Sequence, residues 1–113
     1  MVRNMIIHQP HASIQWTQQG PGLEFSLLRA GDGGSSTMFV RMAAGSHAPL
    51  HTHAGGEETY LVSGCLRVGE HVLRAGDYLW TPPGVEHDGH AEEDTTFFVV
   101  LPEGLQFSGA PAT

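Results

Sequence analysis

Residues 51–64 read HTHAGGEETYLVSG, and this stretch decides how the rest of the chain is interpreted. His51 and His53 are one residue apart, so on an extended strand their side chains point to the same face, about 7 Å apart. Two imidazoles placed in this way can converge on one metal ion at roughly 2.1 Å each. The glycines at 55–56 allow the chain to reverse, and Glu57 can then bring a carboxylate to the same ion. Taken alone, the stretch fits a polar surface loop equally well.

The composition is that of a single soluble domain covering residues 1–113, with a tail at 108–113 that we expect to be frayed. The chain is 40% hydrophobic and 15% charged, as in ordinary globular proteins. No run approaches the roughly 18 apolar residues of a membrane span, and no secretory signal is visible. The single cysteine, Cys65, excludes an internal disulfide and is typical of a cytoplasmic protein.

The charge balance argues against two classes of partner. The chain has 12 acidic residues against five arginines and no lysine, and its net charge is −7. Nucleic acids and anionic membranes both require clustered cations, so we expect neither as a partner. The eight histidines are many for 113 residues.

The 15 glycines and seven prolines divide the chain into short segments, and none of these carries a helical apolar period. Residues 68–71 predict a two-residue hairpin with a type II′ turn at Gly69. The segment TTFFVVL at 95–101 is apolar on both faces, as in a strand covered on both sides. Many short antiparallel strands predict a sandwich, a jelly roll or a small barrel. The expected strands are 5–9, 14–18, 23–28, 37–43, 50–53, 58–62, 65–68, 71–74, 78–81 and 95–101.

A second stretch, GDYLWTPPGVEH at 76–87, ends in a histidine just after a Pro-Pro-Gly turn. Together the two stretches resemble the motifs of the cupin superfamily. The first cupin motif, G-x5-H-x-H-x3,4-E-x6-G, is met at 45–64 by Gly45, His51, His53, Glu57 and Gly64.

The second cupin motif, G-x5-P-x-G-x2-H-x3-N, is met at 76–91 by Gly76, Pro82, Gly84 and His87. The sequence departs from the motif only at its last position, where Ala91 replaces asparagine. That position is not a metal ligand in the family, so the departure affects local turn bonding.

The resemblance implies an all-β fold, a small cupin jelly-roll barrel that forms one domain and pairs as a homodimer. It also implies one divalent metal ion per chain (Fe, Zn, Ni or Mn, with Fe favoured for catalysis), held by His51, His53, Glu57 and His87. The GGEE form of the first motif is similar to a subgroup that contains zinc-binding cupin domains of anti-sigma factors and diketone or hydroxyacetophenone dioxygenases. We expect no room for a helical sigma-binding domain in 113 residues, which disfavours a transcription regulator.

Three functions are compatible with this site. The leading one is a metal-dependent, iron-type dioxygenase of a small organic substrate, because four protein ligands leave two positions for O₂ and a chelating substrate. The alternative is a non-catalytic zinc module that binds or senses a small molecule. A metal-dependent isomerase ranks lowest, because its acid/base pair would have to come from His90 and Glu58.

For several other residues, the sequence is compatible with two different roles. Glu58 could replace Glu57 as a ligand, but the six-residue gap to Gly64 selects Glu57. His90 either orients a substrate or lies on the surface, and His47 either supports a ligand imidazole or faces solvent. Arg41 either meets an anionic substrate inside the barrel or protects an edge strand. The aromatic residues expected in the core are Phe39, Tyr78, Trp80, Phe97 and Phe98.

Overall fold

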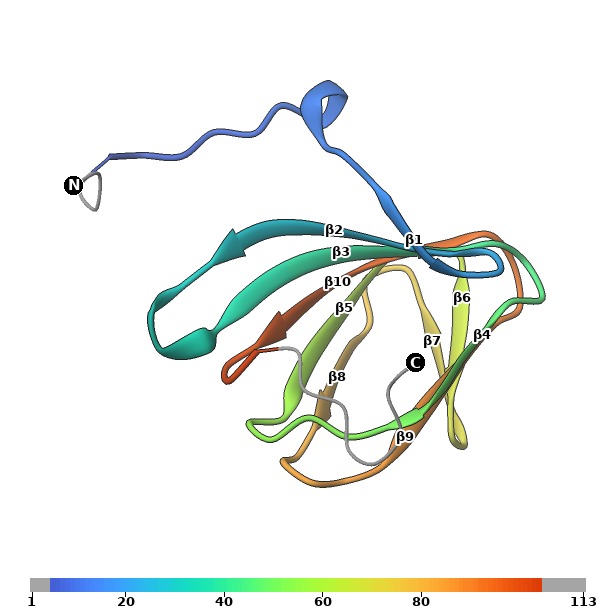
Figure 1. Ribbon diagram of the computed structural model, residues 1–113. Helices are drawn as coiled ribbons and strands as arrows, with labels where there is room; N and C mark the ends of the chain where they lie inside the picture. The colour runs from blue at the N-terminus through green and yellow to red at the C-terminus, as the bar shows by residue number, and fades with distance from the viewer. Residues whose placement is uncertain (1–4, 105–113) are drawn as a thin grey trace.

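The computed structural model describes residues 5–104, and within them ten strands form two antiparallel sheets that face each other (Figure 1). The six-stranded sheet has, in spatial order, β1 (Thr17–Gly20), β2 (Leu23–Ala30), β3 (Ser36–Met42), β10 (Thr95–Leu101), β5 (Glu57–Ser63) and β8 (Tyr78–Thr81). The four-stranded sheet has β4 (His47–His51), β9 (His87–Ala91), β6 (Cys65–Val68) and β7 (His71–Arg74). Two single-turn 3₁₀ helices, η1 (His11–Ser13) and η2 (Asp32–Gly34), complete the fold. The predicted all-β architecture is confirmed.

The core lies between the two sheets. Side chains of β10 alternate strictly: Thr95, Phe97, Val99 and Leu101 are buried, whereas the three residues between them are half-buried. This strand lies between β3 and β5, so both of its edges are paired and its apolar inner face meets the core of the barrel. The four-stranded sheet contributes Leu66, Val68, Leu73 and Ala91 to the same core.

Several predicted elements have the predicted bounds. Strands β6, β7, β8 and β10 begin and end where the sequence pattern placed them. The hairpin between β6 and β7 pairs Val68 with His71, and Gly69 has φ +58°. No other residue type has a positive φ in the part of the chain that the structure describes, so Glu70 takes the negative φ that a type II′ turn requires.

Other predictions were wrong. Residues 5–9 form no strand, because Met5, Ile6 and Ile7 are exposed and run away from the barrel, with no strand beside them (Figure 1). Strand β9 was not predicted, and β4 begins three residues before the predicted 50–53. Tyr78 and Trp80 lie on the surface, 58% and 46% exposed. The predicted frayed tail at 108–113 lies outside the described residues. Within the described part, no helix is long and apolar enough to cross a membrane.

Arg41 lies on the outer face of the six-stranded sheet and not inside the barrel. Its guanidinium pairs with Glu24 and lies 4.0 Å from the ring centroid of Trp16. Strand β3 is flanked by β2 and β10, so Arg41 does not protect a sheet edge either. Both predicted roles of Arg41 are therefore wrong.

Replacing Gly64 by alanine should destabilise the fold more than the same change at Gly76. The two glycines have φ of +94° and +92°, so both variants carry a similar backbone cost of about 1–2 kcal/mol. Only at Gly64 would the new Cβ lie 2.4 Å from Asp94 O and Thr95 Oγ1, whereas nothing lies within 4 Å at Gly76. The free energy of unfolding of Gly64→Ala, measured in urea, should be lower than that of Gly76→Ala by a further ~2 kcal/mol. Equal losses would contradict this packing constraint.

Candidate metal centre

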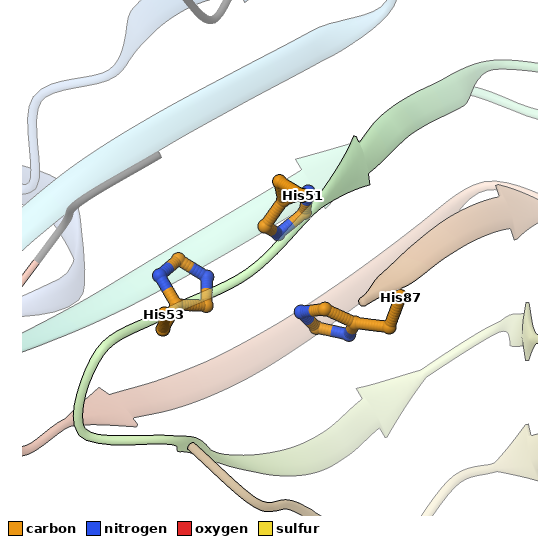
Figure 2. A group of neighbouring side chains, drawn as sticks. All are labelled: His51, His53 and His87. Atoms are coloured by element: carbon orange, nitrogen blue, oxygen red, sulfur yellow. The ribbon is translucent and has the colours of Figure 1, made fainter. Parts of the chain in front are cut away.

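Four side chains from both cupin-like motifs meet at the junction of the two sheets. His51 ends β4, His53 lies in the turn that follows, Glu57 begins β5 and His87 begins β9. Figure 2 shows the three imidazoles directed toward a common space between these segments. His51 and His53 do not share one extended strand, as the sequence suggested; they converge because the chain leaves β4 between them.

Backbone hydrogen bonds hold the two motifs together at this junction. The carbonyl oxygen of His53 accepts hydrogen bonds from the N–H groups of Gly56 and Gly84, each 3.2 Å long. In the register of β4 with β9, His51 pairs directly with His87. Gly56, directly before Glu57, and Gly84, three residues before His87, are therefore bound to the same carbonyl oxygen, which holds the two motifs next to each other.

The distances between the donor atoms suit a single ion after small movements. The ligand atoms of His51, His53 and His87 all lie within 4.8 Å of one another. Glu57 Oε1 is 3.2 Å from His87 Nε2, and Glu57 Oε2 is 3.9 Å from His53 Nε2. In an octahedral shell with metal–ligand bonds of about 2.1 Å, adjacent donor atoms lie about 3 Å apart and opposite donor atoms about 4.2 Å apart. The four groups could thus hold one metal ion.

The tautomer of His51 is fixed by its own strand. Its Nδ1 lies 2.6 Å from the carbonyl oxygen of Pro49. A carbonyl oxygen only accepts, so Nδ1–H is the donor and the lone pair of the neutral ring is on Nε2. A backbone carbonyl behind a metal-binding imidazole is the usual device that orients such a ligand.

Burial disfavours the charged forms of His53, His87 and Glu57 when no metal is bound. Burial, with a smaller contribution from the nearby His51, lowers the pKa of His53 to about 4. Burial, together with His51 and His53, lowers the pKa of His87 to about 4, although Asp88 opposes this shift. Burial raises the pKa of Glu57 to about 7. Near neutral pH the two imidazoles are therefore uncharged, as metal ligands must be, and a divalent cation would compensate an ionised Glu57.

The hydrogen-bonding state of His87 supports this assignment. Its Nε2 is buried and makes no hydrogen bond with any described residue, even though Glu57 is close. A buried polar atom without a hydrogen bond costs free energy unless a ligand satisfies it. Three imidazoles and one carboxylate are a donor set for Fe(II), Zn, Ni or Mn, so the residues fit the metal that the sequence implies.

A cavity of about 420 Å³ lies against these donors, between the two sheets. Its wall is mostly apolar and includes Leu23, Phe25, Met38, Met42, Phe97 and Leu101. A small organic molecule could therefore occupy this space and reach the donor atoms directly.

The other candidate residues do not belong to the group of four donors, although His47 and Asp88 also line the cavity. Glu58 points outward, where its Oε1 accepts a hydrogen bond from the hydroxyl of Tyr78. His47 and His90 stack on each other with ring centroids 4.2 Å apart, and Asp88 lies beside both. Asp88 was missed by the sequence reasoning, although its two-residue spacing from His90 places both on one face of a strand.

Comparisons with known proteins agree on the family and on the fold. The chain matches the sequence model of the ChrR cupin-like domain over residues 4–104. No curated protein matches its sequence significantly.

Three solved structures illustrate the likeness of fold. An RmlC-like cupin from Ralstonia eutropha is 21% identical, with a TM-score of 0.73, over 82% of this chain and 66% of its own. A chain of the Rhodobacter sphaeroides complex of SigE with the anti-sigma ChrR is 23% identical, with a TM-score of 0.74, over 82% and 52%. The acetylacetone dioxygenase of Acinetobacter johnsonii is 19% identical, with a TM-score of 0.74, over 86% and 72%. This chain thus spans about half to two thirds of the length of the first two, and the likeness establishes a cupin fold.

The raised pKa of Glu57 should appear in the pH dependence of metal binding. Below about pH 7 a metal ion must displace a proton from Glu57, whereas His53 and His87 stay neutral down to about pH 4. The ratio of zinc affinities of the wild type and Glu57→Gln should therefore rise about tenfold per pH unit below pH 7 and level off above it. Competition with a chelator of known affinity measures this ratio. A ratio that does not vary with pH would exclude Glu57 as a ligand that titrates.

Proposed function

Because this chain belongs to the family of ChrR cupin-like domains, we propose that it binds a divalent metal ion in the barrel and acts as a metal-dependent oxygenase on a small organic molecule. The ligands are His51, His53, Glu57 and His87. The metal favoured for this reaction is iron.

The observation that carries this proposal is the position of the cavity. The donors lie at the wall of an apolar space of about 420 Å³, which suits a molecule of modest size. The acetylacetone dioxygenase of Acinetobacter johnsonii has a similar fold, which makes a small diketone or enol the first substrate class to consider.

Different residues of the site have different roles in the proposed reaction. His51, His53, Glu57 and His87 would hold an Fe(II) ion, which would supply the redox chemistry for oxygenation. The apolar side chains of Met38, Met42 and Phe97 exclude water and bind the hydrocarbon part of the substrate. The carbonyl oxygen of Pro49 accepts the hydrogen bond of His51 Nδ1–H and so fixes the ring with Nε2 as the atom that would bind the metal.

A zinc-bound binding or sensing module is the second candidate. The same donors suit Zn²⁺, which has no redox chemistry. The fold likeness to a chain from the Rhodobacter sphaeroides complex of SigE with the anti-sigma ChrR favours this candidate, since it links the fold to a regulatory assembly.

A metal-dependent isomerase has the least support. Its acid/base pair would be His90 and Glu58, and neither of them is among the described residues that line the cavity. The Glu58 carboxylate instead accepts the hydrogen bond of Tyr78 on the outer surface.

Loss of a metal ligand should abolish oxygenase activity while the fold persists. Protein made without a histidine tag, nickel resin or oxygen would be loaded with Fe(II), and O₂ uptake would be followed with acetylacetone and related enols. We expect uptake in the wild type, and a loss of about 100-fold or more in His51→Ala and His87→Ala. His71→Ala, at an exposed histidine of β7, is the matched control and should keep full activity.

Two results would contradict this proposal. An iron-loaded wild type that consumes no O₂ with any of these substrates, yet holds one zinc ion tightly, would favour the binding module. Tight binding of one iron per chain by His87→Ala would show that the ligand assignment is wrong.

We also propose that the chain forms a homodimer through the outer face of the six-stranded sheet. Tyr78, Tyr60, Phe98 and Phe39 lie directly opposite one another in the register of β8, β5, β10 and β3, and form a continuous aromatic row. Phe39 also stacks on Trp16, with ring centroids 6.3 Å apart. Tyr60 and Tyr78 of this row are exposed and Phe39 and Phe98 are half-buried, and a partly exposed aromatic row is typical of a surface that a partner covers.

The dimer should be lost when a charge is placed in the aromatic row. Tyr60, 47% exposed, would be replaced by lysine, because burying an ammonium group at a dimer interface is costly. Sedimentation velocity at micromolar concentration should show a dimer for the wild type and a monomer for Tyr60→Lys. Val72→Lys, at a 50% exposed residue on the other sheet, should remain dimeric. A wild-type monomer would refute the proposal.

A further inference from the structure

A second cluster of metal-ligating side chains lies on the same strand pair as the first, but on its opposite face. His47 of β4 pairs directly with His90 of β9. Asp88 precedes His90 by two residues on the strand, so the two side chains share a face. The alternate residues of β9, Gly89 and Ala91, are buried toward the core.

The atoms of the three side chains lie at distances that suit one ion. Asp88 Oδ2 is 3.3 Å from His90 Nε2 and 3.7 Å from His47 Nε2. The two imidazoles are nearly parallel, with 20° between their planes, and their ligand atoms with that of Asp88 all lie within 4.8 Å. Tetrahedral zinc with bonds of about 2.1 Å separates its ligands by about 3.4 Å.

The donor set is selective for borderline metals. Two imidazoles with one carboxylate bind Zn²⁺, Ni²⁺ or Cu²⁺ in preference to Mg²⁺ or Ca²⁺, which require oxygen ligands. The side chains of His47, Asp88 and His90 are 48%, 30% and 37% exposed, so an ion reaches them from solvent and water can complete its shell.

From this geometry we infer a second divalent transition-metal site, formed by His47, Asp88 and His90 on the outer face of the four-stranded sheet. It shares no residue with the group in the barrel. An ion bound there bridges β4 and β9, the two strands that carry His51 and His87. Because the three ligands are brought together only in the folded state, the ion stabilises the fold by RT ln(1 + [M]/Kd), where [M] is the free metal concentration.

Zinc binding by tag-free full-length protein tests this inference. Isothermal titration should give about two equivalents for the wild type, one tight and one weaker because only three ligands hold it. His47→Ala/His90→Ala should lose the weaker equivalent and keep the tight one, and His51→Ala/His87→Ala should do the reverse. Asp88→Asn, which keeps both rings, should weaken the second site by about tenfold or more. His71→Ala is the matched control and should resemble the wild type.

Thermal unfolding supplies an independent measurement. Zinc should raise the Tm of His51→Ala/His87→Ala, where only the outer site remains, and this rise should vanish when His47 and His90 are also replaced. The inference is overturned if His47→Ala/His90→Ala binds zinc with the stoichiometry and affinity of the wild type. Since each pair of ligands is removed separately, failure of the outer site leaves the site in the barrel testable.

Discussion

The two hydrogen bonds that the carbonyl oxygen of His53 accepts from Gly56 and Gly84 are the interaction on which the geometry of the candidate metal centre depends. The chain must leave the four-stranded sheet at His51 and enter the six-stranded sheet at Glu57, and it has only the residues between them in which to do so. Anchoring the loop before His87 to the same peptide unit brings the second motif into register with the first. One carbonyl oxygen thus links the two motifs.

This junction concentrates polar groups where they are costly. His53 and Glu57 are 4% and 7% exposed beside an apolar cavity, where an uncompensated charge is strongly disfavoured. The free-energy cost of burying these polar groups is offset by apolar burial in the adjacent strands β5 and β10, where Leu61, Val99 and Leu101 are almost completely buried. The same burial lowers the pKa of His53 and raises that of Glu57, so it disfavours charge on both side chains when no metal is bound. The apolar strands around the site therefore hold together a set of donor atoms whose burial a bound cation would make more favourable.

The sequence predicted the parts of the fold that leave a strong local pattern. Apolar runs bounded by turn residues defined β6, β7, β8 and β10, and motif spacing predicted the four residues that converge. Strand β9, HDGHA, was missed because its inward residues are as small as Gly89 and Ala91, so no apolar alternation is visible. Residues 5–7 are apolar but have no strand to pair with, and Trp80 lies on the outer face of an edge strand. Neither position can be predicted from local sequence, because both are set by how the strands pair in the folded chain.

The outer cluster could not be predicted because it depends on a register shift. His47 and His51 are four residues apart, so strict alternation would place them on the same face of β4. The register with β9 shifts between Ala48 and His51, where Pro49 interrupts the ladder, so that His47 pairs with His90 while His51 pairs with His87. One extra residue in β4 thus directs its two histidines to opposite faces. The same strand pair then supplies a buried group beside an apolar cavity and an exposed group in contact with water.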